Sequence, residues 1–245
     1  MKCIILAGGY AKRLWPITRH IPKPLLDVGN KPMIDHIIEK LKPVDEIDKI
    51  YISTNKKFEE PFRNWMSDHQ NGKLELVIEP TEDEGGKFGT IVGIQYLIES
   101  RNIDDDCLII AGDNLFDFDI NHFIQEFRSK SPLLAVFDVK DYEKSMLYGI
   151  VSVDENSKVI GFVEKPENPQ STLAATVCYG FPKETMKLFS EYLSQGNRKD
   201  SPGFFVSWLQ ERVPVYAYRF EGHWFDIGDF ESLEKARKFM NNSGK

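Results

Sequence analysis

The 245-residue sequence lacks the features of disulfide-rich, zinc-binding or membrane-spanning proteins. Its three cysteines, Cys3, Cys107 and Cys178, show no paired spacing, so we expect small buried side chains in a reducing compartment. No run of eighteen apolar residues is present, and Gly8 and Gly9 cut the N-terminal apolar run short of a signal-peptide core. We therefore expect a cytoplasmic protein that does not contact membranes.

Several catalytic and phosphate-binding motifs are also missing. The sequence contains neither Gly-x-Gly-x-x-Gly nor Gly-x4-Gly-Lys-Ser/Thr, which excludes the dinucleotide fingerprint and the P-loop. It has no Gly-x-Ser-x-Gly elbow and no recognisable Ser/His/Asp or Cys/His arrangement, so covalent catalysis is not indicated. Phosphoryl and nucleotidyl transfer need no protein nucleophile, because positioning, cations and a metal suffice.

Positive charge is concentrated near the N-terminus of an otherwise acidic chain. The net charge is −7, yet residues 1–42 hold eight Lys and Arg against three Asp and Glu, a local charge of +5. An apolar run ends at Gly8-Gly9 and is followed by Lys12, Arg13 and Lys23, as when a buried strand delivers a phosphate-binding loop. This pattern suits a small polyanion such as a nucleoside triphosphate, and not a nucleic acid. Spacing alone leaves open that the glycines only turn the chain and the cations are solvated.

The first part of the chain alternates between strand and helix patterns. Parallel strands joined by helices predict an α/β fold, with a Rossmann-like, mixed but mostly parallel sheet whose ligands lie at the carboxyl ends of the strands. The predicted strands span residues 3–7, 49–53, 74–78, 107–111 and 133–139, and the predicted helices span 33–41, 58–66, 90–98 and 120–127.

The second part does not continue the regular alternation of strand and helix patterns. A polar turn at residues 154–157 separates two strand patterns, which predicts a hairpin of 150–153 and 159–164. Further strands are expected at 176–181 and 215–220, and helices at 183–192 and 204–211. We interpret residues 1–245 as one domain with a nucleotide-binding half at about 1–139 and a smaller α+β half at about 140–245.

Two aspartates follow predicted strands. Asp113 lies in Ala-Gly-Asp-Asn and Asp226 in Trp-Phe-Asp-Ile-Gly. Mg²⁺ bound to substrate phosphates keeps several waters and takes only one or two protein carboxylates, so this pair predicts a magnesium site. Two simpler roles stay open: Asp113 as a turn residue, and Asp226 as the N-cap of the final helix.

The hairpin carries a second group of candidates. Glu164 and Lys165 end its second strand, where the lysine offers a point charge for a phosphate and the carboxylate accepts hydrogen bonds from hydroxyls. Gly149, after Tyr148, permits a close backbone approach to a ligand. Two alternatives stay open: Glu164 and Lys165 could form a surface ion pair, and Gly149 could serve only as a turn residue. A lone His223 and its neighbouring tryptophan are expected to be packing residues.

These residues together resemble a known family. The chain is similar to the sugar-phosphate nucleotidyltransferases, or nucleotide-sugar pyrophosphorylases, most closely those of the glucose-1-phosphate thymidylyltransferase type. The similarity runs from about Lys2 to the final helix. It rests on Leu-Ala-Gly-Gly-x-x-x-Arg-Leu-x-Pro-x-Thr, Pro-Lys-Pro-Leu-Leu and Lys-Pro-Met-Ile, which stand here at Leu6 to Thr18, Pro22 to Leu26 and Lys31 to Ile34.

The resemblance implies a role for each matching position. Arg13, Lys23 and Asp113 would be catalytic, and Asp113 with Asp226 would hold Mg²⁺ as the cofactor. The nucleotide would contact Leu6, Ala7, Gly8, Gly9, Arg13, Lys23, Glu79, Gly89 and Thr90. The sugar phosphate would contact Asn114, Tyr148, Gly149, Glu164, Lys165 and Tyr179.

The implied reaction is direct in-line attack of a sugar 1-phosphate on a nucleoside triphosphate, with dTTP or UTP and glucose 1-phosphate as the expected substrates. CTP or GTP with another phosphorylated acceptor, and a non-catalytic nucleotide-sugar-binding subunit, are the alternatives. Small molecules are the expected partners, and a homo-oligomer is left open. The chain ends soon after the final helix, so we expect no appended β-helix.

Three positions depart from the family pattern. Glu79-Pro80 replaces the usual Gln-Pro, and an acidic segment through residues 84–87 follows it, which leaves the choice of base open. Gly89-Thr90 is followed by Ile91, so the helix start carries bulkier side chains than the family pattern. Val177 stands where relatives often have glycine, which predicts a smaller or differently shaped sugar pocket.

Overall fold

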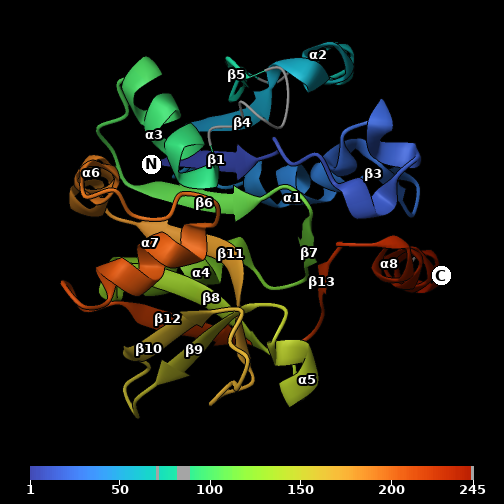
Figure 1. Cartoon of the computed structure of the whole chain (residues 1–245). Helices are drawn as coiled ribbons and strands as arrows, with labels where there is room; N and C mark the ends of the chain where they lie inside the picture. Colours follow the sequence, from blue (N-terminus) through green and yellow to red (C-terminus); the bar gives the residue numbers. More distant parts are fainter. Residues whose placement is uncertain (70–71, 82–88, 244–245) are drawn as a thin grey trace. The chain divides into compact units, whose positions relative to one another are not determined.

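The computed structural model describes residues 1–69, 72–81 and 89–243, and these form two compact units (Figure 1). The first, here called the phosphate-loop unit, contains residues 2–69, 72–81, 110–117 and 223–243. The second, the hairpin unit, contains residues 89–109 and 118–222 together with Met1. The segment at 84–87 that departs from the family pattern lies outside the described residues.

Three parallel strands form the centre of the phosphate-loop unit. Strand β1 (Lys2–Leu6) pairs with β4 (Lys49–Asn55), which pairs with β5 (Leu74–Glu79). The last six residues of β4 are all buried, as expected for a parallel strand covered on both faces. All three strands were predicted to within two residues at each end. Their carboxyl ends lie at one edge, where parallel sheets bind ligands.

Helices flank these strands as the apolar spacing predicts. Helix α1 (Met33–Leu41) follows Pro32 and buries Ile34, Ile37, Ile38 and Leu41. Helix α2 (Glu59–Ser67) continues the short helix η4 (Lys56–Phe58), which Asn55 caps by accepting the Phe58 backbone N–H at 3.2 Å. The remaining helices of this unit are η1 (Lys12–Leu14), η2 (Ile17–Arg19), η3 (Lys23–Leu25) and α8 (Phe230–Ser243).

Short strands that the sequence did not predict complete the unit. Strand β7 (Asn114–Phe116) pairs antiparallel with β13 (Trp224–Asp226), and β2 (Asp27–Val28) pairs antiparallel with β3 (Lys31–Pro32). The β7–β13 ladder joins segments about 110 residues apart in the chain.

The hairpin unit is built on five strands in the order β10, β9, β11, β8, β12. The predicted hairpin is confirmed as β9 (Gly149–Val153) and β10 (Val159–Glu164), which pair antiparallel. Strand β11 (Leu173–Phe181) pairs antiparallel with β9 and with β8 (Leu133–Asp138), and β8 pairs parallel with β12 (Tyr216–Phe220). The prediction that residues 133–139 join the parallel strands of the first part is wrong, because β8 pairs antiparallel with β11 and parallel with β12.

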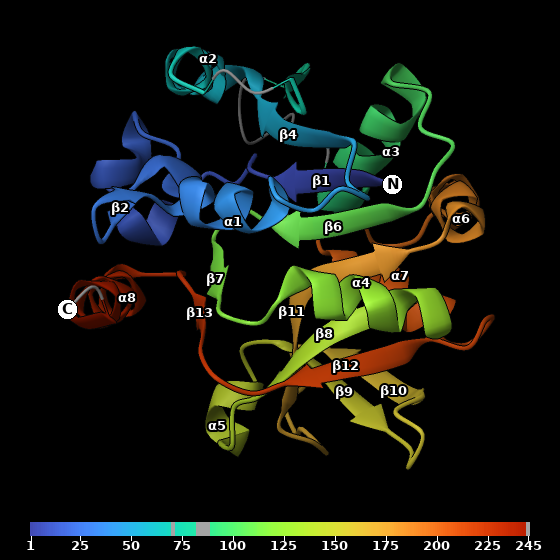
Figure 2. The same ribbon diagram turned by 180° about the vertical axis from the view of Figure 1, so that it is seen from behind.

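Helices cover both faces of these strands. Figures 1 and 2 view the chain from opposite sides, with α7 (Pro202–Leu209) in front of the strands in one and α4 (Ile120–Ser129) in front in the other. Phe189 of α6 (Lys183–Ser194) and Phe205 of α7 stack with ring centroids 3.8 Å apart. Helices α3 (Thr90–Ser100) and α5 (Tyr142–Ser145) complete the unit.

The boundaries of the compact units differ from the two predicted halves. Residues 89–109 and 118–139 group with the later strands, and residues 223–243 group with the first strands. Strand β6 (Cys107–Ala111) carries the chain from the hairpin unit to the phosphate-loop unit. The single-domain interpretation stays a prediction. Across the described residues, no helix has the length and apolar character needed to cross a bilayer, and all three cysteines are buried, as expected.

Candidate active site

The phosphate loop is fixed to the carboxyl end of β4. The Ala7 backbone N–H donates to the Ser53 carbonyl at 2.8 Å, and the Asn55 side chain donates to the Gly8 carbonyl at 2.8 Å. A Cβ on Gly8 would lie 3.6 Å from Glu79 Oε1, whereas a Cβ on Gly9 would meet no described atom within 4 Å. Strand β1 therefore ends at Leu6, one residue before the predicted end, and the two glycines begin the loop, as predicted.

A turn at Ala11 follows the two glycines and leads into a short helix with one buried apolar residue and one exposed cation. Ala11 adopts φ 46°, in the left-handed region, and the fully buried Thr18 hydroxyl donates to its carbonyl at 2.8 Å. The short helix η1 follows, with Leu14 buried and Arg13 exposed. The threonine of the sequence motif thus stabilises the turn.

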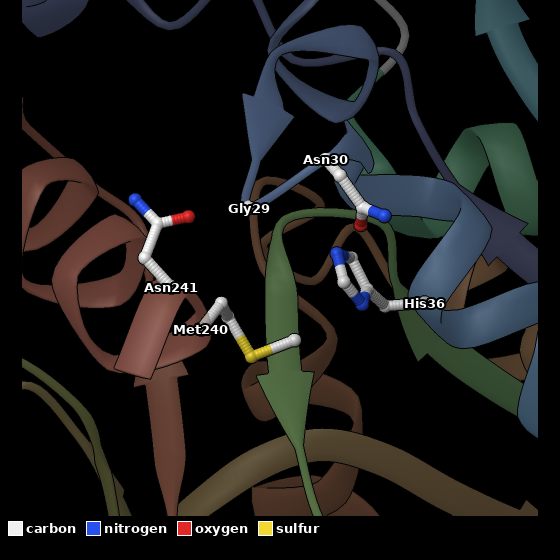
Figure 3. A pocket seen from close by; sticks show the side chains of 5 residues that line it. All are labelled: Gly29, Asn30, His36, Met240 and Asn241. Carbon is white, nitrogen blue, oxygen red and sulfur yellow. The ribbon is translucent and has the colours of Figure 1, made fainter. Parts of the chain in front are cut away.

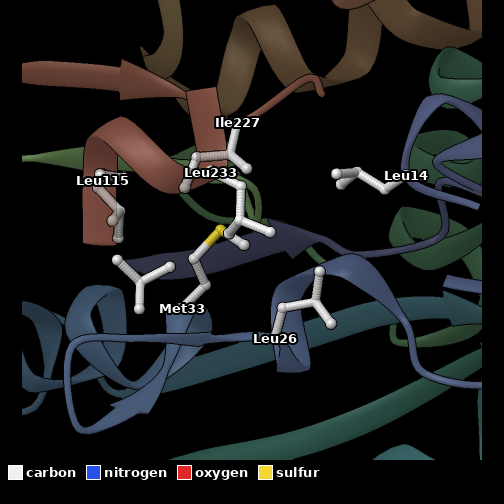
Figure 4. Close-up of a cluster of buried hydrophobic side chains, with 8 residues drawn as sticks. Leu14, Leu26, Met33, Leu115, Ile227 and Leu233 are labelled. Atoms are coloured by element: carbon white, nitrogen blue, oxygen red, sulfur yellow. The ribbon is translucent and has the colours of Figure 1, made fainter. Parts of the chain in front are cut away.

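Buried apolar residues anchor the neighbours of the predicted site residues. Leu14 follows Arg13, Leu115 follows Asn114 and Ile227 follows Asp226 in the chain. Figure 4 shows that these three side chains belong to one hydrophobic cluster. Its buried members are Leu14, Leu26, Val28, Met33, Leu115, Ile227, Leu233 and Ala236. Packing in this cluster therefore fixes the backbone next to the polar groups.

Lys23 connects the loop to both aspartate segments. Its ammonium group forms an ion pair with the Asp113 carboxylate and donates to the Ile227 carbonyl at 2.7 Å. The Lys23 side chain is 11% exposed and that of Asp113 is 29% exposed. An ion pair shielded to this degree is less screened than a surface pair and sets the direction of both side chains.

Asp226 lies on the β7–β13 ladder, and Asp113 directly precedes the β7 end of that ladder. Asp226 stands opposite Asn114 in the β7–β13 pairing, and the Ile227 N–H donates to the Asp113 carbonyl at 3.2 Å. The alternative that Asp226 caps the final helix is wrong, because Asp229 does so by accepting the Ser232 N–H at 2.9 Å. Asp113 is a turn residue between β6 and β7, and it also lies next to the strand pairing that contains Asp226.

Asn114 is buried, and its side chain already has partners. Its amide oxygen accepts the Trp224 indole N–H at 2.6 Å, and its amide nitrogen lies 3.3 Å from Asp113 Oδ1. A structural role for Trp224 agrees with the expectation from sequence. His223 is less isolated than expected, because its Nδ1 lies 2.9 Å from Asp117 Oδ2. The predicted contact of Asn114 with a sugar stays a prediction.

Arg13 extends over Gly228, a residue that sequence reasoning did not assign to the site. A Cβ at position 228 would lie 2.9 Å from the Arg13 guanidinium. The positive charge of Arg13 also helps to lower the pKa of Asp229, after the larger contributions of the Ser232 backbone and hydroxyl. The sequence shows that Gly228 follows Asp226 and Ile227, but it does not indicate that the folded chain places this glycine next to Arg13.

Glu79 lies at the carboxyl end of β5, beside Gly8. The Ser53 hydroxyl donates to Glu79 Oε1 at 2.9 Å. Burial raises the pKa of the Glu79 carboxyl above its ordinary value of 4.5, and the Ser53 hydrogen bond partly opposes this shift. A carboxylate therefore lies next to the phosphate loop at the ligand-binding edge of the strands.

The hairpin unit gathers the other predicted residues around Glu164. Glu164 pairs with Gly149 in the β9–β10 register, and burial raises the pKa of its carboxyl. The Lys165 N–H donates to the Tyr148 carbonyl at 2.9 Å, with Lys165 at φ 50°. Tyr179 is 1% exposed, and burial together with the Glu164 charge raises the pKa of its hydroxyl.

Gly89 and Thr90 begin helix α3 in the hairpin unit. The Thr90 hydroxyl donates to the Asp200 carbonyl at 3.0 Å, and the Ile91 N–H donates to the Lys199 carbonyl at 3.1 Å. Gly89 has φ 77°, and a Cβ there would lie 2.6 Å from the Lys199 carbonyl oxygen. The start of α3 is therefore fixed by residues 199–200, which sequence reasoning did not connect to it.

The aspartate pair meets the chemical requirements of Mg²⁺. The described residues include no group of three or more His, Cys, Asp or Glu that could hold a metal alone. Mg²⁺ bound with a nucleotide takes one or two carboxylates and completes its shell with water and phosphate oxygens. Asp226 on the β7–β13 ladder and Asp113 directly before it fit this donor set.

A separate cavity lies in the phosphate-loop unit (Figure 3). It has a volume of about 230 Å³ and is lined by Gly29, Asn30, His36, Met240 and Asn241. None of the predicted site residues lines it.

The glycine turn, the buried lysine and the aspartate segments lie at the carboxyl edge of parallel strands, which is where α/β proteins bind their ligands. The family model described as "Nucleotidyl transferase" matches residues 2–243. The chain therefore belongs to the nucleotidyl transferase family.

Individual relatives agree with this family. The chain is 30% identical to the bifunctional protein GlmU of Methanocaldococcus jannaschii, over 98% of the chain and 54% of that protein. It is 28% identical to the UTP–glucose-1-phosphate uridylyltransferase of a Synechocystis species, over 93% of the chain and 60% of that protein. The chain thus spans roughly half to three fifths of these relatives.

A solved structure matches over nearly its full length. A Bacillus anthracis protein assigned as a glucose-1-phosphate thymidylyltransferase, in complex with a sucrose, superimposes with a TM-score of 0.84 and 28% identity. The match covers 99% of this chain and 96% of that one. It confirms the predicted fold class, a mixed and mostly parallel sheet flanked by helices.

Proposed function

We propose that this protein transfers a nucleotidyl group from a nucleoside triphosphate to a sugar 1-phosphate and releases pyrophosphate. One observation carries the proposal. The Lys23 ammonium group directly contacts Asp113 and the carbonyl of Ile227, which follows Asp226 at the end of the β7–β13 ladder. Cations and metal-binding carboxylates in one place are what transfer between two anions requires.

The proposed reaction needs no covalent intermediate on the protein. A phosphate oxygen of the sugar 1-phosphate attacks the α-phosphorus and forms the new O–P bond. The bond from the α-phosphorus to the bridging oxygen breaks, and its electron pair leaves with pyrophosphate. The exposed Arg13 would neutralise the leaving pyrophosphate, and Lys23 would contact both the triphosphate and the incoming phosphate. Loss of one such charge contact typically lowers kcat about 10²- to 10³-fold.

Asp113 and Asp226 would hold Mg²⁺, which when bound supplies positive charge that offsets the repulsion between the two phosphate groups. Trp224 and Asn114 would fix the Asp113 carboxylate through the bonds described above. Lys23 would keep that carboxylate directed toward the loop.

The acceptor side of the proposal rests on the hairpin unit. Glu164 would accept hydrogen bonds from sugar hydroxyls beside Gly149, and Lys165 would bind the sugar phosphate, with Tyr148 and Tyr179 contributing to the pocket. Glucose 1-phosphate with dTTP or UTP is the first substrate pair to consider. The motif resemblance and the named activities of the similar proteins support this pair.

Glu79 favours a second candidate for the base. An ionised carboxylate only accepts hydrogen bonds, and it pairs well with the amino group of cytosine or with the adjacent N–H donors of guanine. Thymine and uracil offer a single N–H between two carbonyl groups. CTP or GTP is therefore the alternative donor.

Pyrophosphate release tests the proposal directly. The assay contains Mg²⁺ and glucose 1-phosphate with dTTP, UTP, CTP, GTP and ATP in parallel, and is repeated with mannose 1-phosphate, N-acetylglucosamine 1-phosphate and phosphocholine. Release with one or two triphosphates supports the proposal and identifies the base. If every pair fails although the nucleotide binds, the protein is a binding subunit and the catalytic proposal is wrong.

A further inference from the structure

The Glu164 carboxylate occupies a narrow slot between two glycines of the hairpin unit. A Cβ added to Gly203, in the first turn of α7, would lie 2.0 Å from Glu164 Oε2. A Cβ added to Gly149 would lie 3.1 Å from the same oxygen and 2.6 Å from the Phe162 ring. Real Cβ contacts are essentially never shorter than 3.0 Å, so a side chain at position 203 and this carboxylate position exclude each other.

Other contacts keep the slot in place. The Ser207 hydroxyl of α7 donates to the Phe162 carbonyl at 3.1 Å, which fixes the helix against β10. The Ser201 hydroxyl accepts the Gly203 N–H at 3.3 Å, and it favours the ionised form of Glu164, which partly opposes the rise in pKa that burial causes. Ser201 therefore caps α7 and lies beside the carboxylate that enters the slot.

We infer that Gly203 and Ser201 are positioning residues for sugar recognition, and that the missing side chain at 203 lets Glu164 present its carboxylate to the acceptor hydroxyls. This inference rests on the proposed function, because it takes Glu164 to be an acceptor ligand. Neither Gly203 nor Ser201 belongs to the motifs that identify the family in this sequence.

The same segment also supports the start of α3. Lys199 and Asp200 accept the hydrogen bonds of Ile91 and Thr90, and Ser201 and Gly203 follow directly in the chain. A variant that disturbed the whole segment would therefore alter nucleotide binding as well as sugar binding. A variant that displaced only the Glu164 carboxylate would alter sugar binding alone.

Gly203→Ala is the variant that separates these cases. The atom that the new methyl group meets first is the far end of the flexible Glu164 side chain, which moves more easily than backbone. Alanine is also favoured over glycine in a helix, so α7 is expected to stay folded. Gly161→Ala is the matched control on β10, because its Cβ would make only an ordinary contact of 3.7 Å with Ser152.

The measurement is the steady-state rate of pyrophosphate release with each substrate varied in turn, on the full chain. In Gly203→Ala we expect the KM for the sugar phosphate to rise roughly 10- to 100-fold, as for loss of a hydrogen bond to a charged group. The KM for the nucleotide should stay within about twofold and the Tm should not fall. An unchanged sugar-phosphate KM would overturn the inference, as would equal rises in both KM values with a lower Tm.

Ser201→Ala gives an independent readout through pH. Burial raises the pKa of Glu164, while Ser201, Lys165 and Arg198 favour its ionised form, and Tyr179 is a further neighbour. Removing the Ser201 hydroxyl should raise that pKa further. The acidic limb of kcat/KM for the sugar phosphate should therefore move to higher pH, and an unmoved limb would contradict the role of Ser201.

Failure of the proposed function is recognised separately. It would appear as absence of turnover in the unsubstituted protein with every substrate pair. A crystal structure of Gly203→Ala then still tests the positioning role. A Glu164 carboxylate displaced from its slot supports the inference, and one that keeps its place beside an added methyl group overturns it.

Discussion

The Lys23 ammonium group donates to the Ile227 carbonyl at 2.7 Å and at the same time pairs with the Asp113 carboxylate. This single side chain therefore joins a residue after β1 to segments after β6 and β13. The phosphate loop is thereby fixed relative to Asp113 and to the residue that follows Asp226.

Replacing Lys23 by methionine should reduce both activity and stability. The Asp113 carboxylate would lose its partner in a partly buried position, and the triphosphate would lose a cation. We expect kcat to fall by about 10²- to 10³-fold and the free energy of unfolding to fall by roughly 1–3 kcal/mol. Steady-state kinetics and urea unfolding measure the two effects. Lys49→Met, which breaks the more exposed Lys49–Glu75 pair, is the control and should change neither substantially.

Asp113→Asn should abolish turnover but keep much of the nucleotide affinity. The substitution preserves shape and removes the negative charge proposed to hold Mg²⁺, while Gly8 and Glu79 are unchanged. Titration calorimetry with the nucleotide and a rate assay across Mg²⁺ concentrations test both statements. Asp48→Asn, at the start of β4, is the control. Normal turnover of Asp113→Asn at limiting Mg²⁺ would remove Asp113 from the metal site.

Glu79→Gln should change the preferred base. An amide both donates and accepts, so the variant should favour UTP or dTTP relative to CTP or GTP, by roughly 10-fold or more if the base contacts this side chain. The ratio of kcat/KM values across the triphosphates measures the change. If the ratios match those of the unsubstituted protein, Glu79 does not contact the base.

The same substitution should stabilise the protein at neutral pH. Burial raises the pKa of Glu79 above 4.5 in the folded protein. The protonated carboxyl therefore contributes its full share to the free energy of unfolding below pH 4.5, and this share is lost as pH rises through the folded-state pKa. Glutamine carries no such dependence and still accepts from Ser53. The Tm of Glu79→Gln should therefore exceed that of the unsubstituted protein at pH 7, and the difference should shrink toward pH 4. A constant difference across this range would contradict the assigned cause.

Val177→Gly should be tolerated in spite of the usual cost of glycine in a strand. Val177 has φ 50° at the irregular register between β11 and β8, and this conformation is unfavourable for a β-branched residue by about 1–2 kcal/mol. Relief of that strain should offset the added flexibility of the unfolded chain. Val151→Gly, in regular and buried β9, should lose several kcal/mol. Urea unfolding of both variants measures the contrast.

Local patterns predicted much of this fold. The spacing of Ile34, Ile37, Ile38 and Leu41 sets helix α1, and the apolar runs set the parallel strands, because each pattern lies within one element. The loop glycines and Lys23 were found for the same reason. Their motif is continuous in the sequence.

Features that depend on distant pairing were not predictable. Strands β7 and β13 have three residues each, too few for an alternating pattern, and they form only because they pair with each other. Lys23 reaches Ile227 across 204 positions of sequence. In the sequence, nothing distinguishes Gly203 from other glycines near helix starts. Its role follows only from the folded position of the Glu164 carboxylate, which leaves no room for a side chain at position 203.

The ladder between β7 and β13 has a consequence for the newly synthesised chain. Closing a loop of about 110 residues costs roughly 4 kcal/mol in chain entropy, and Asp226 is translated long after Asp113. A nascent chain that has already formed the glycine turn, Lys23 and β5 still lacks one carboxylate of the pair and the carbonyl that Lys23 binds. On the ribosome, the proposed nucleotide-binding contacts of the glycine turn should therefore form before the proposed metal site is complete.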